Sequence, residues 1–125
     1  MNILLDTHVL IWALENNPTL SDDARSSIIR ASNMVFVSSV SIWEIGIKKS
    51  LGKLETPDNL AEEIKLHRFT PLSISYDHAE LAGKLPDIHR DPFDRMLIAQ
   101  AIIEKLTLVT RDKLIPRYDV KTLKA

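Results

Sequence analysis

The fold of this chain is organised around the stretch Asp91-Pro92-Phe93-Asp94-Arg95-Met96-Leu97-Ile98-Ala99-Gln100-Ala101-Ile102-Ile103. Asp91 suits the N-cap of a helix, Pro92 suits its first position, and Asp94 then falls at its third position. The residues that follow are almost all apolar, which predicts a helix with little solvent-exposed face, deep in the protein. Two acids at a helix start are also typical of a plain cap that interacts with the helix dipole. A functional site is therefore predicted only if other acids converge on the same place.

Length and composition predict one globular domain over residues 1–125. The chain is 45% hydrophobic and 26% charged, which is ordinary for folded proteins and argues against disorder. No apolar run approaches the roughly 20 residues of a membrane helix, and no signal peptide is visible, so we expect no membrane partner. The absence of cysteine excludes disulfides and thiolate metal sites and favours a cytoplasmic location. With a net charge of −1, nucleic-acid binding would need a local basic rim or a bound cation.

Strand-like and helix-like patterns alternate along the chain. Strands are expected at residues 2–5, 34–37, 69–74 and 106–109, with a final edge strand at 119–123. Helices are expected to begin at Asp6-Thr7, Ser21, Ser38 or Ser39, Thr56-Pro57, Ser75 and Asp91. Ile28, Ile29, Trp12 and Trp43 are interpreted as inward-facing. This order predicts an α/β fold with a central, mostly parallel sheet covered by helices on both faces.

Acids recur where the predicted strands end. Asp6 ends the first strand, Glu44 lies in the first turns of the helix after the second, and Asp112 follows the strand at 106–109. Asp94 starts the apolar helix that precedes that strand. Because ligands bind beyond the carboxyl ends of parallel strands, these four carboxylates are expected to share one crevice.

Each of the four acids also has a plainer interpretation. Asp6 could be a helix N-cap, and Asp112 could cap the turn that follows it. Glu44 fits a capping box with Ser41 and an i,i+4 pair with Lys48. A cluster of carboxylates raises the pKa of its members, so a divalent cation is its natural partner. Oxygen ligands without cysteine favour Mg²⁺ or Mn²⁺, which can activate a water and stabilise the charge of a phosphodiester under attack.

Four segments resemble the signature segments of the PIN-domain family and, more closely, the VapC-type ribonuclease toxins of prokaryotic toxin–antitoxin pairs. They are Ile3-Leu4-Leu5-Asp6-Thr7-His8, Ser41-Ile42-Trp43-Glu44-Ile45, the stretch from Asp91 to Ala101, and Leu108-Val109-Thr110-Arg111-Asp112. The resemblance covers essentially the whole chain, in family order. It implies a three-layer α/β/α fold, an endoribonuclease dependent on Mg²⁺ or Mn²⁺, a homodimer, and a cognate antitoxin that covers the active site.

The resemblance also assigns the site residues. Asp6, Glu44 and Asp94 match the three most constant family acids, as catalytic and metal-binding groups. The fourth acid is less well matched, because many family members carry it a few residues beyond the Thr-Arg pair, where Asp112 is the nearest candidate here. Asp91 is interpreted first as the helix cap and second as an outer group of the metal site.

Other polar residues near these acids are weighed against structural roles. Thr7, Thr110 and Ser39 could orient carboxylates or waters, although Ser39 suits local capping better. Basic residues are expected at the rim, where they could contact RNA phosphates. Arg95 is the favoured candidate because it stands next to Asp94, where it could alternatively pair with a neighbouring acid. The others are Arg90, Arg111, Lys48, Lys49 and Lys113. His8 and His89 lack the spacing of a metal site and are interpreted as structural.

Several other functions are considered. A haloacid-dehalogenase-like phosphatase needs an aspartate two residues after the first, where His8 stands. A receiver-like signalling domain needs an aspartate after its third strand, where Ser73-Ile74-Ser75 has none. A PIN-like module that binds RNA without cutting usually lacks some of the acids, and here the set is complete. A housekeeping nuclease without a toxin role stays open as an alternative.

Overall fold

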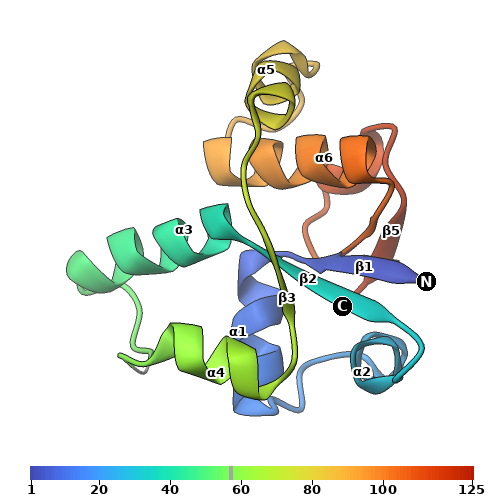
Figure 1. Cartoon of the computed structure of the whole chain (residues 1–125). Coiled ribbons are helices and arrows are strands. Elements are labelled where there is room, and N and C mark those ends of the chain that lie inside the picture. The colour runs from blue at the N-terminus through green and yellow to red at the C-terminus, as the bar shows by residue number, and fades with distance from the viewer. Residues whose placement is uncertain (57) are drawn as a thin grey trace.

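A five-stranded parallel sheet forms the centre of the computed structural model, which describes residues 1–56 and 58–125 (Figure 1). The strand order is β3-β2-β1-β4-β5, and all four neighbouring pairs are parallel. The strands are β1 (Asn2–Leu5), β2 (Met34–Ser38), β3 (Thr70–Leu72), β4 (Thr107–Thr110) and β5 (Thr122–Lys124). The predicted parallel sheet is therefore confirmed.

Helices lie on both sides of this sheet (Figure 1). They are α1 (Thr7–Glu15), α2 (Asp22–Ile29), α3 (Ser39–Ser50), α4 (Leu60–Leu66), α5 (Tyr76–Lys84) and α6 (Pro92–Glu104), with a short 3₁₀ helix at Ile115–Arg117. Helices α5 and α6 lie on one side of the sheet and α1, α2 and α4 on the other, while α3 extends outward from the end of β2. This is the predicted three-layer α/β/α arrangement. Within the part of the chain that the structure describes, no helix is long and apolar enough to cross a membrane.

The core divides into two clusters, one on each face of the sheet. Ile3 and Leu5 of β1 belong to the cluster on the side of α1 and α2, whereas Leu4 packs with Leu97 and Ile98 of α6. Successive residues of a strand point to opposite faces, so a strand covered on both sides must be apolar throughout. Full burial of a side chain such as Leu97 contributes about 1.5–3 kcal/mol. The apolar character of α6 thus reflects its place against the sheet.

The start of α6 is built as the sequence predicts. Oδ1 of Asp91 accepts hydrogen bonds from the backbone N–H groups of Phe93 (2.8 Å) and Asp94 (3.3 Å). Pro92 is the first helical residue. This cap places the carboxylate of Asp94 in the first turn of a buried helix, close to the carboxyl end of the sheet.

The sheet has its switch point between β1 and β4. From β1 the chain runs outward through β2 to β3, and then it returns to form β4 and β5 on the other side of β1. Asp6, which follows β1, donates its backbone N–H to the carbonyl oxygen of Val109 in β4 (3.1 Å). Crevices at such points are the usual ligand sites of open α/β sheets.

Some element boundaries differ from the sequence-based expectation. Strand β3 covers only residues 70–72 of the expected 69–74, and β5 begins at Thr122 instead of residue 119. Helix α4 begins at Leu60 after Asn59, and its expected start at Thr56-Pro57 includes Pro57, which lies outside the described residues. The helix begins instead after Asn59, a residue type that is also preferred at helix N-caps, although its side chain makes no capping hydrogen bond here.

Two apolar residues expected to face inward are exposed. Ile29 is 76% exposed because Ala24 and Ile28, four residues apart, form the inner face of α2 and Ile29 lies past it. Trp43 is 63% exposed, since the buried stripe of α3 runs through Val40, Ser41, Glu44 and Ile45. Trp12, in contrast, packs against the core as predicted.

Candidate active site

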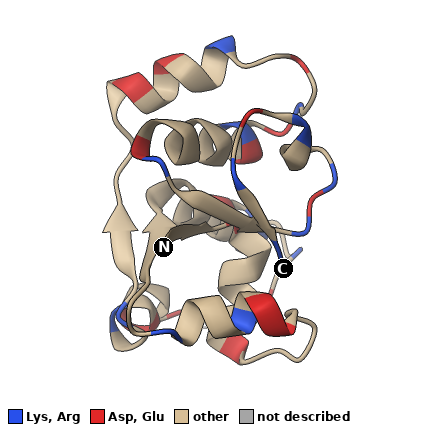
Figure 2. Cartoon of the chain, turned by 90° about the vertical axis from the view of Figure 1, so that its right-hand side faces the viewer, with Lys and Arg blue, Asp and Glu red and all other residues tan. Residues whose placement is uncertain are grey.

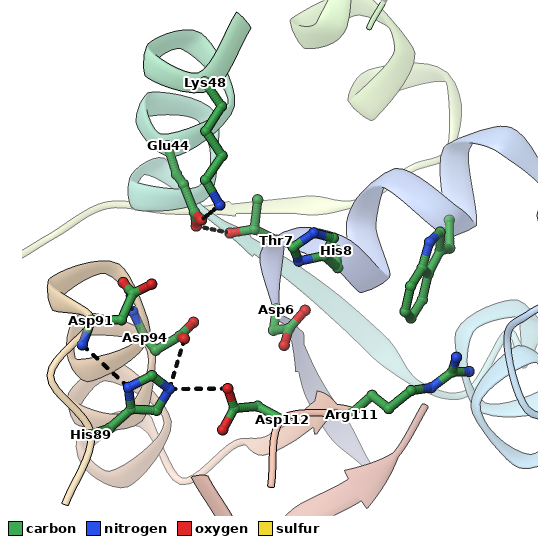
Figure 3. A pocket seen from close by; sticks show the side chains of 11 residues that line it. Asp6, Thr7, His8, Glu44, Lys48, His89, Asp91, Asp94, Arg111 and Asp112 are labelled. Carbon is green, nitrogen blue, oxygen red and sulfur yellow. Dashed lines mark hydrogen bonds and ion pairs between the residues drawn. The ribbon is translucent and has the colours of Figure 1, made fainter. Parts of the chain in front are cut away.

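The four predicted acids line one pocket of about 460 Å³ at the carboxyl end of the sheet (Figure 3). They are Asp6, Glu44, Asp94 and Asp112, and Asp91 joins them. They come from the N-cap of α1, the middle of α3, the first turn of α6 and the loop after β4. The strand order therefore gathers residues that are up to 106 positions apart in the sequence.

Asp6 is buried and held by two hydrogen bonds. Oδ1 accepts from the backbone N–H of Val9 (3.1 Å), which makes Asp6 the N-cap of α1. Oδ2 accepts from the Thr110 hydroxyl (2.5 Å), so the predicted orienting role of this threonine is borne out. Burial raises the pKa of Asp6 although both hydrogen bonds act to lower it. Asp6 is thus both the cap and a fixed carboxylate in the pocket.

Glu44 lies almost fully buried on α3. Its Oε1 accepts a hydrogen bond from the Thr7 hydroxyl (2.6 Å), and its Oε2 lies 2.6 Å from Nζ of Lys48. The hydrogen bond to Glu44 raises the pKa of Lys48. The expected pair with Lys48 is confirmed, but the capping box with Ser41 is wrong, because α3 begins at Ser39 with Ser38 as its cap.

The surroundings of Asp94 disfavour the charged form of its carboxyl group. Burial, followed by repulsion from Asp91 and Asp6, raises the pKa of Asp94 to about 7. Oδ2 of Asp94 lies 3.0 Å from Nε2 of His89. The fold therefore holds a carboxylate in a place where its negative charge is disfavoured unless positive charge is added.

Asp91 and Asp112 combine capping with a place in the pocket. Oδ1 of Asp112 accepts from the backbone N–H groups of Leu114 (2.7 Å) and Ile115 (3.1 Å), as the capping interpretation expected. Oδ2 of Asp112 lies 3.0 Å from Nε2 of His89. Burial acts to raise the pKa of Asp112, but the hydrogen bond to His89 and the two backbone bonds outweigh it and lower the pKa. Capping and a functional role are thus compatible in one residue.

His8 and His89 both line the pocket, although the sequence favoured structural roles for them, and His89 contacts the acids directly. It was interpreted as structural, yet its buried ring stands between Asp94 and Asp112 (Figure 3). Its position two residues before the Asp91 cap was the one available signal, because that segment must run along the edge of the pocket. Sequence spacing alone does not show in which direction such a side chain points.

The predicted basic rim is only partly present. Arg95 was the favoured phosphate contact, but its guanidinium donates to four backbone carbonyl oxygens, those of Ala82, Leu85, Pro86 and His89. This prediction was wrong, because the start of α6 uses Arg95 to hold the loop after α5. Figure 2 shows Lys and Arg on several elements and not gathered on one face in this view.

Two basic residues do line the pocket, Lys48 and Arg111. The guanidinium of Arg111 stacks over the Trp12 ring, 4.5 Å from its centroid, and donates to the carbonyl oxygen of Ala125 (2.9 Å). Of the other predicted rim residues, Lys49 pairs with Asp58. Arg90, Lys49 and Lys113 are not among the residues that line this pocket. Ser39, for which local capping was expected, donates its hydroxyl instead to the carbonyl oxygen of Leu72 in β3 (3.4 Å).

The donor chemistry of the pocket fits a hard divalent cation. Carboxylate oxygens predominate, and hard cations prefer oxygen ligands. Oδ1 of Asp94 and Oδ2 of Asp91 have no hydrogen-bond partner among the described residues, so both can accept a cation. The repulsion that raises the pKa of Asp94 is what such a charge would relieve.

Comparison with known proteins agrees with this architecture. The chain matches the PIN domain over residues 3–121. It is 30% identical over 118 residues to the ribonuclease VapC22 of Mycobacterium tuberculosis, a match that covers 89% of this chain and 87% of that protein. The chain belongs to the PIN-domain family.

Solved structures share the fold at low sequence identity. The VapBC2 complex of Rickettsia felis bound to a DNA fragment from its promoter has a TM-score of 0.73 and 18% identity, and covers 98% of both chains. A toxin–antitoxin complex from Klebsiella pneumoniae has a TM-score of 0.68 and 19% identity, and covers 98% of this chain and 96% of the other. At these identities the similarity establishes the fold, in agreement with the three-layer arrangement.

Proposed function

We propose that this chain is a divalent-metal-dependent endoribonuclease that hydrolyses RNA phosphodiester bonds and is the toxin of a toxin–antitoxin pair. The observation that carries the proposal is the convergence of Asp6, Glu44, Asp94 and Asp112 in one pocket at the switch point of the sheet. Family membership and the ribonuclease relative support it. An RNA-binding module would not need to keep several buried carboxylates together, because their mutual repulsion destabilises the fold.

The acids divide the work according to their partners. Asp6 and Asp94 bind the cation directly, while Glu44, fixed by Thr7 and Lys48, positions the cation or the attacking water. When bound, Mg²⁺ or Mn²⁺ lowers the pKa of a water and stabilises negative charge on the phosphate. Asp112 is the fourth acid of the set. Fixed carboxylates help because a metal site depends on ligands whose orientation is set by a second layer of hydrogen bonds.

Lys48 is the cation best placed to meet the RNA backbone, and Arg111 is less free to do so because its guanidinium already donates to the carbonyl oxygens of Ala125 and Thr19. Both line the acid pocket, on opposite sides of Asp6 in Figure 3. Phosphate contacts from lysine and arginine position a nucleic acid without reading its sequence. Their small number fits the overall charge of the chain, which gives no general attraction for RNA.

The proposed partners are an RNA substrate, a second copy of the chain and a cognate antitoxin. Solved structures of the same fold include the VapBC2 and Klebsiella pneumoniae toxin–antitoxin complexes, which supports the antitoxin. An antitoxin that covers the pocket would block access to the acids. We expect the protein to act in the cytoplasm, where RNA is available and a chain without cysteine needs no oxidising compartment.

The function is tested with purified protein and single-stranded or structured RNA. Cleavage is expected with Mg²⁺ or Mn²⁺ and none in EDTA, measured by gel separation of end-labelled RNA. An Asp94→Asn protein purified in parallel controls for contaminating nucleases. Undiminished cleavage after rigorous chelation would refute the metal mechanism, and RNA binding without cleavage in any metal would indicate a binding module.

The toxin role has its own test. Expression of the chain is expected to arrest growth, and co-expression of a small protein encoded beside it is expected to restore growth. If growth continues although RNA cleavage is demonstrated in vitro, the chain is a housekeeping nuclease and the toxin assignment is wrong.

A further inference from the structure

His89 is a buried histidine whose two ring nitrogens both have partners. Nδ1 lies 3.2 Å from the backbone nitrogen of Asp91, which is the N-cap of α6. Nε2 lies 3.0 Å from Oδ2 of Asp112 and 3.0 Å from Oδ2 of Asp94. The backbone of His89 is held as well, because its N–H donates to the Tyr118 hydroxyl (2.7 Å). The ring is therefore fixed from three directions.

These partners determine which nitrogen carries the proton. A backbone N–H can only donate, so Nδ1 must accept and is unprotonated. An ionised carboxylate can only accept, so Nε2 must carry a hydrogen to bond Asp112. Both contacts are satisfied together by the neutral Nε2–H form of the imidazole. A doubly protonated ring would lose the bond from Asp91, and the Nδ1–H form would lose both bonds.

This arrangement conflicts with a role for His89 as a metal ligand. Ligand atoms of His89, Asp94 and Asp112 lie within 4.8 Å of one another, which by distance alone is a candidate metal-binding group. A histidine binds a metal through an unprotonated nitrogen, however. Here Nε2 carries the hydrogen, and the lone pair of Nδ1 is used by the cap of α6.

We propose that His89 is a positioning residue of the active site, in which Nε2–H donates to the carboxylate of Asp112, lies 3.0 Å from Oδ2 of Asp94 and does not bind the metal. The hydrogen lies between two negative groups and reduces their repulsion. It also turns Oδ2 of each carboxylate toward the ring, so that Oδ1 of Asp94, which has no partner among the described residues, is left for the cation. The same ring ties these acids to the start of α6 through Nδ1.

The tautomer is tested directly by NMR on ¹⁵N-labelled wild-type protein without RNA. Long-range ¹H–¹⁵N spectra are expected to show one protonated nitrogen, Nε2, and one unprotonated nitrogen, Nδ1, for His89 at neutral pH. Addition of Mg²⁺ is expected to leave this pattern unchanged. Equal protonation of both nitrogens, or loss of the proton from Nε2 on addition of Mg²⁺, would overturn the proposal.

A matched pair of variants separates the two hydrogen bonds of the ring. In His89→Gln the amide nitrogen can reach the position of Nε2 and keep a donor for the acids. In His89→Asn the shorter amide can accept from the N–H of Asp91 but does not reach the acids. We expect Mn²⁺ affinity to fall about 10–100-fold in His89→Asn, as for other losses of an outer-layer partner, and to fall clearly less in His89→Gln. Equal losses in both folded variants would contradict the donor role.

Pulsed EPR of Mn²⁺ bound to the wild-type protein gives a further check that depends on no variant. We expect no coupling to a directly bound imidazole nitrogen, and such a coupling would show that His89 is a ligand. The proposal refines the proposed function, because it concerns the same metal site, but NMR and EPR do not depend on RNA cleavage. A protein that shows the expected tautomer and binds Mn²⁺ without cutting RNA would refute the ribonuclease assignment alone.

Discussion

His78 and His89 are two buried histidines at opposite ends of α6, and their local hydrogen bonding is nearly the same. Nδ1 of His78 accepts from the N–H of Ser75 (3.0 Å), at the cap of α5, and Nε2 lies 2.8 Å from Oε2 of Glu104. Nδ1 of His89 likewise accepts at the cap of α6, and Nε2 faces carboxylates. The two rings are thus in the same tautomer and make the same kinds of contact.

The difference between them lies in the acids. Glu104 is a single carboxylate whose side chain is 43% exposed, so water can solvate its charge. The acids beside His89 are clustered and shielded, and the pKa of Asp94 rises to about 7 because burial and the charges of Asp91 and Asp6 oppose its ionisation. A histidine–carboxylate pair is therefore a structural link at one end of α6 and part of a proposed metal site at the other. The two ends of α6 differ in the density of charge around the histidine–carboxylate pair, and the pair itself is the same.

The largest expected effect concerns the clustered acids. Asp6→Asn and Asp94→Asn should each lower the rate of RNA cleavage by at least about 100-fold, on the scale of losing a group that stabilises transition-state charge. Glu104→Gln, at the other end of α6, should leave the rate unchanged. Asp91→Asn should lose far less than the first two, since asparagine caps a helix about as well as aspartate.

Initial rates measured for the four variants at one Mn²⁺ concentration check this prediction. A Glu104→Gln variant as inactive as Asp94→Asn would remove the distinction between the two ends of α6. If Asp91→Asn were the most damaging substitution, the division of roles among the acids would be wrong.

Among substitutions at the two ends of α6, only those at the N-terminal end should change stability by an amount that depends on metal. In EDTA the Asp94→Asn variant should be at least as stable as wild type, because it relieves repulsion among the acids. At 100 times its dissociation constant, Mn²⁺ should stabilise the wild type by about 2.7 kcal/mol and the variant by much less. Thermal melts of both proteins in both buffers measure this reversal. If the variant is less stable than wild type by the same amount in both buffers, about 0.3–1 kcal/mol, Asp94 only interacts with the helix dipole.

His78 should contribute to stability without any link to metal. His78→Ala removes the acceptor of the Ser75 N–H and the link to Glu104, so it should destabilise the fold by about 1–3 kcal/mol. The loss should be equal in EDTA and in Mn²⁺, and Mn²⁺ affinity by isothermal titration calorimetry should not change. A fall in Mn²⁺ affinity would mean that the two ends of α6 are coupled and that His78 is more than a local link.

The last comparison concerns the pH dependence of the stability of the metal-free protein. Because burial and the neighbouring acids raise the folded-state pKa of Asp94 to about 7, from 3.8, the folded protein binds this proton more tightly than the unfolded chain. The resulting stability is complete below about pH 4 and is lost as the pH rises through about 7. Asp112 acts in the opposite sense, because its lowered pKa gives stability that is lost as the pH falls.

The effect of Asp94 is isolated by comparison with Asp94→Asn. The difference in melting temperature, wild type minus variant, should decrease between pH 4 and pH 7 in EDTA. A difference that stays constant or increases over this range would show that Asp94 is not held in a charge-disfavouring environment.

The sequence predicted the local structure around the acids. Asp91 and Pro92 predict the start of α6 correctly, because a cap and a proline at the first position act within one turn of helix. Apolar runs predict the parallel sheet, since strands covered on both faces need apolar residues on both faces. The four acids could also be selected, because strand ends are defined locally and the topology of α/β sheets brings them together.

Side-chain direction and partner choice were decided by the tertiary structure alone. Arg95 turns away from the acids to bind four carbonyl oxygens, and Trp43 faces outward, because each depends on which face of its helix meets the rest of the fold. His89 enters the site only because the loops before α6 and after β4 meet there. The sequence by itself determined where α1 and α6 begin beside the site, since capping preferences act over a few neighbouring residues. Contacts between distant segments depend on the packed fold, and they alone determined which charges meet in the pocket and how strongly they repel.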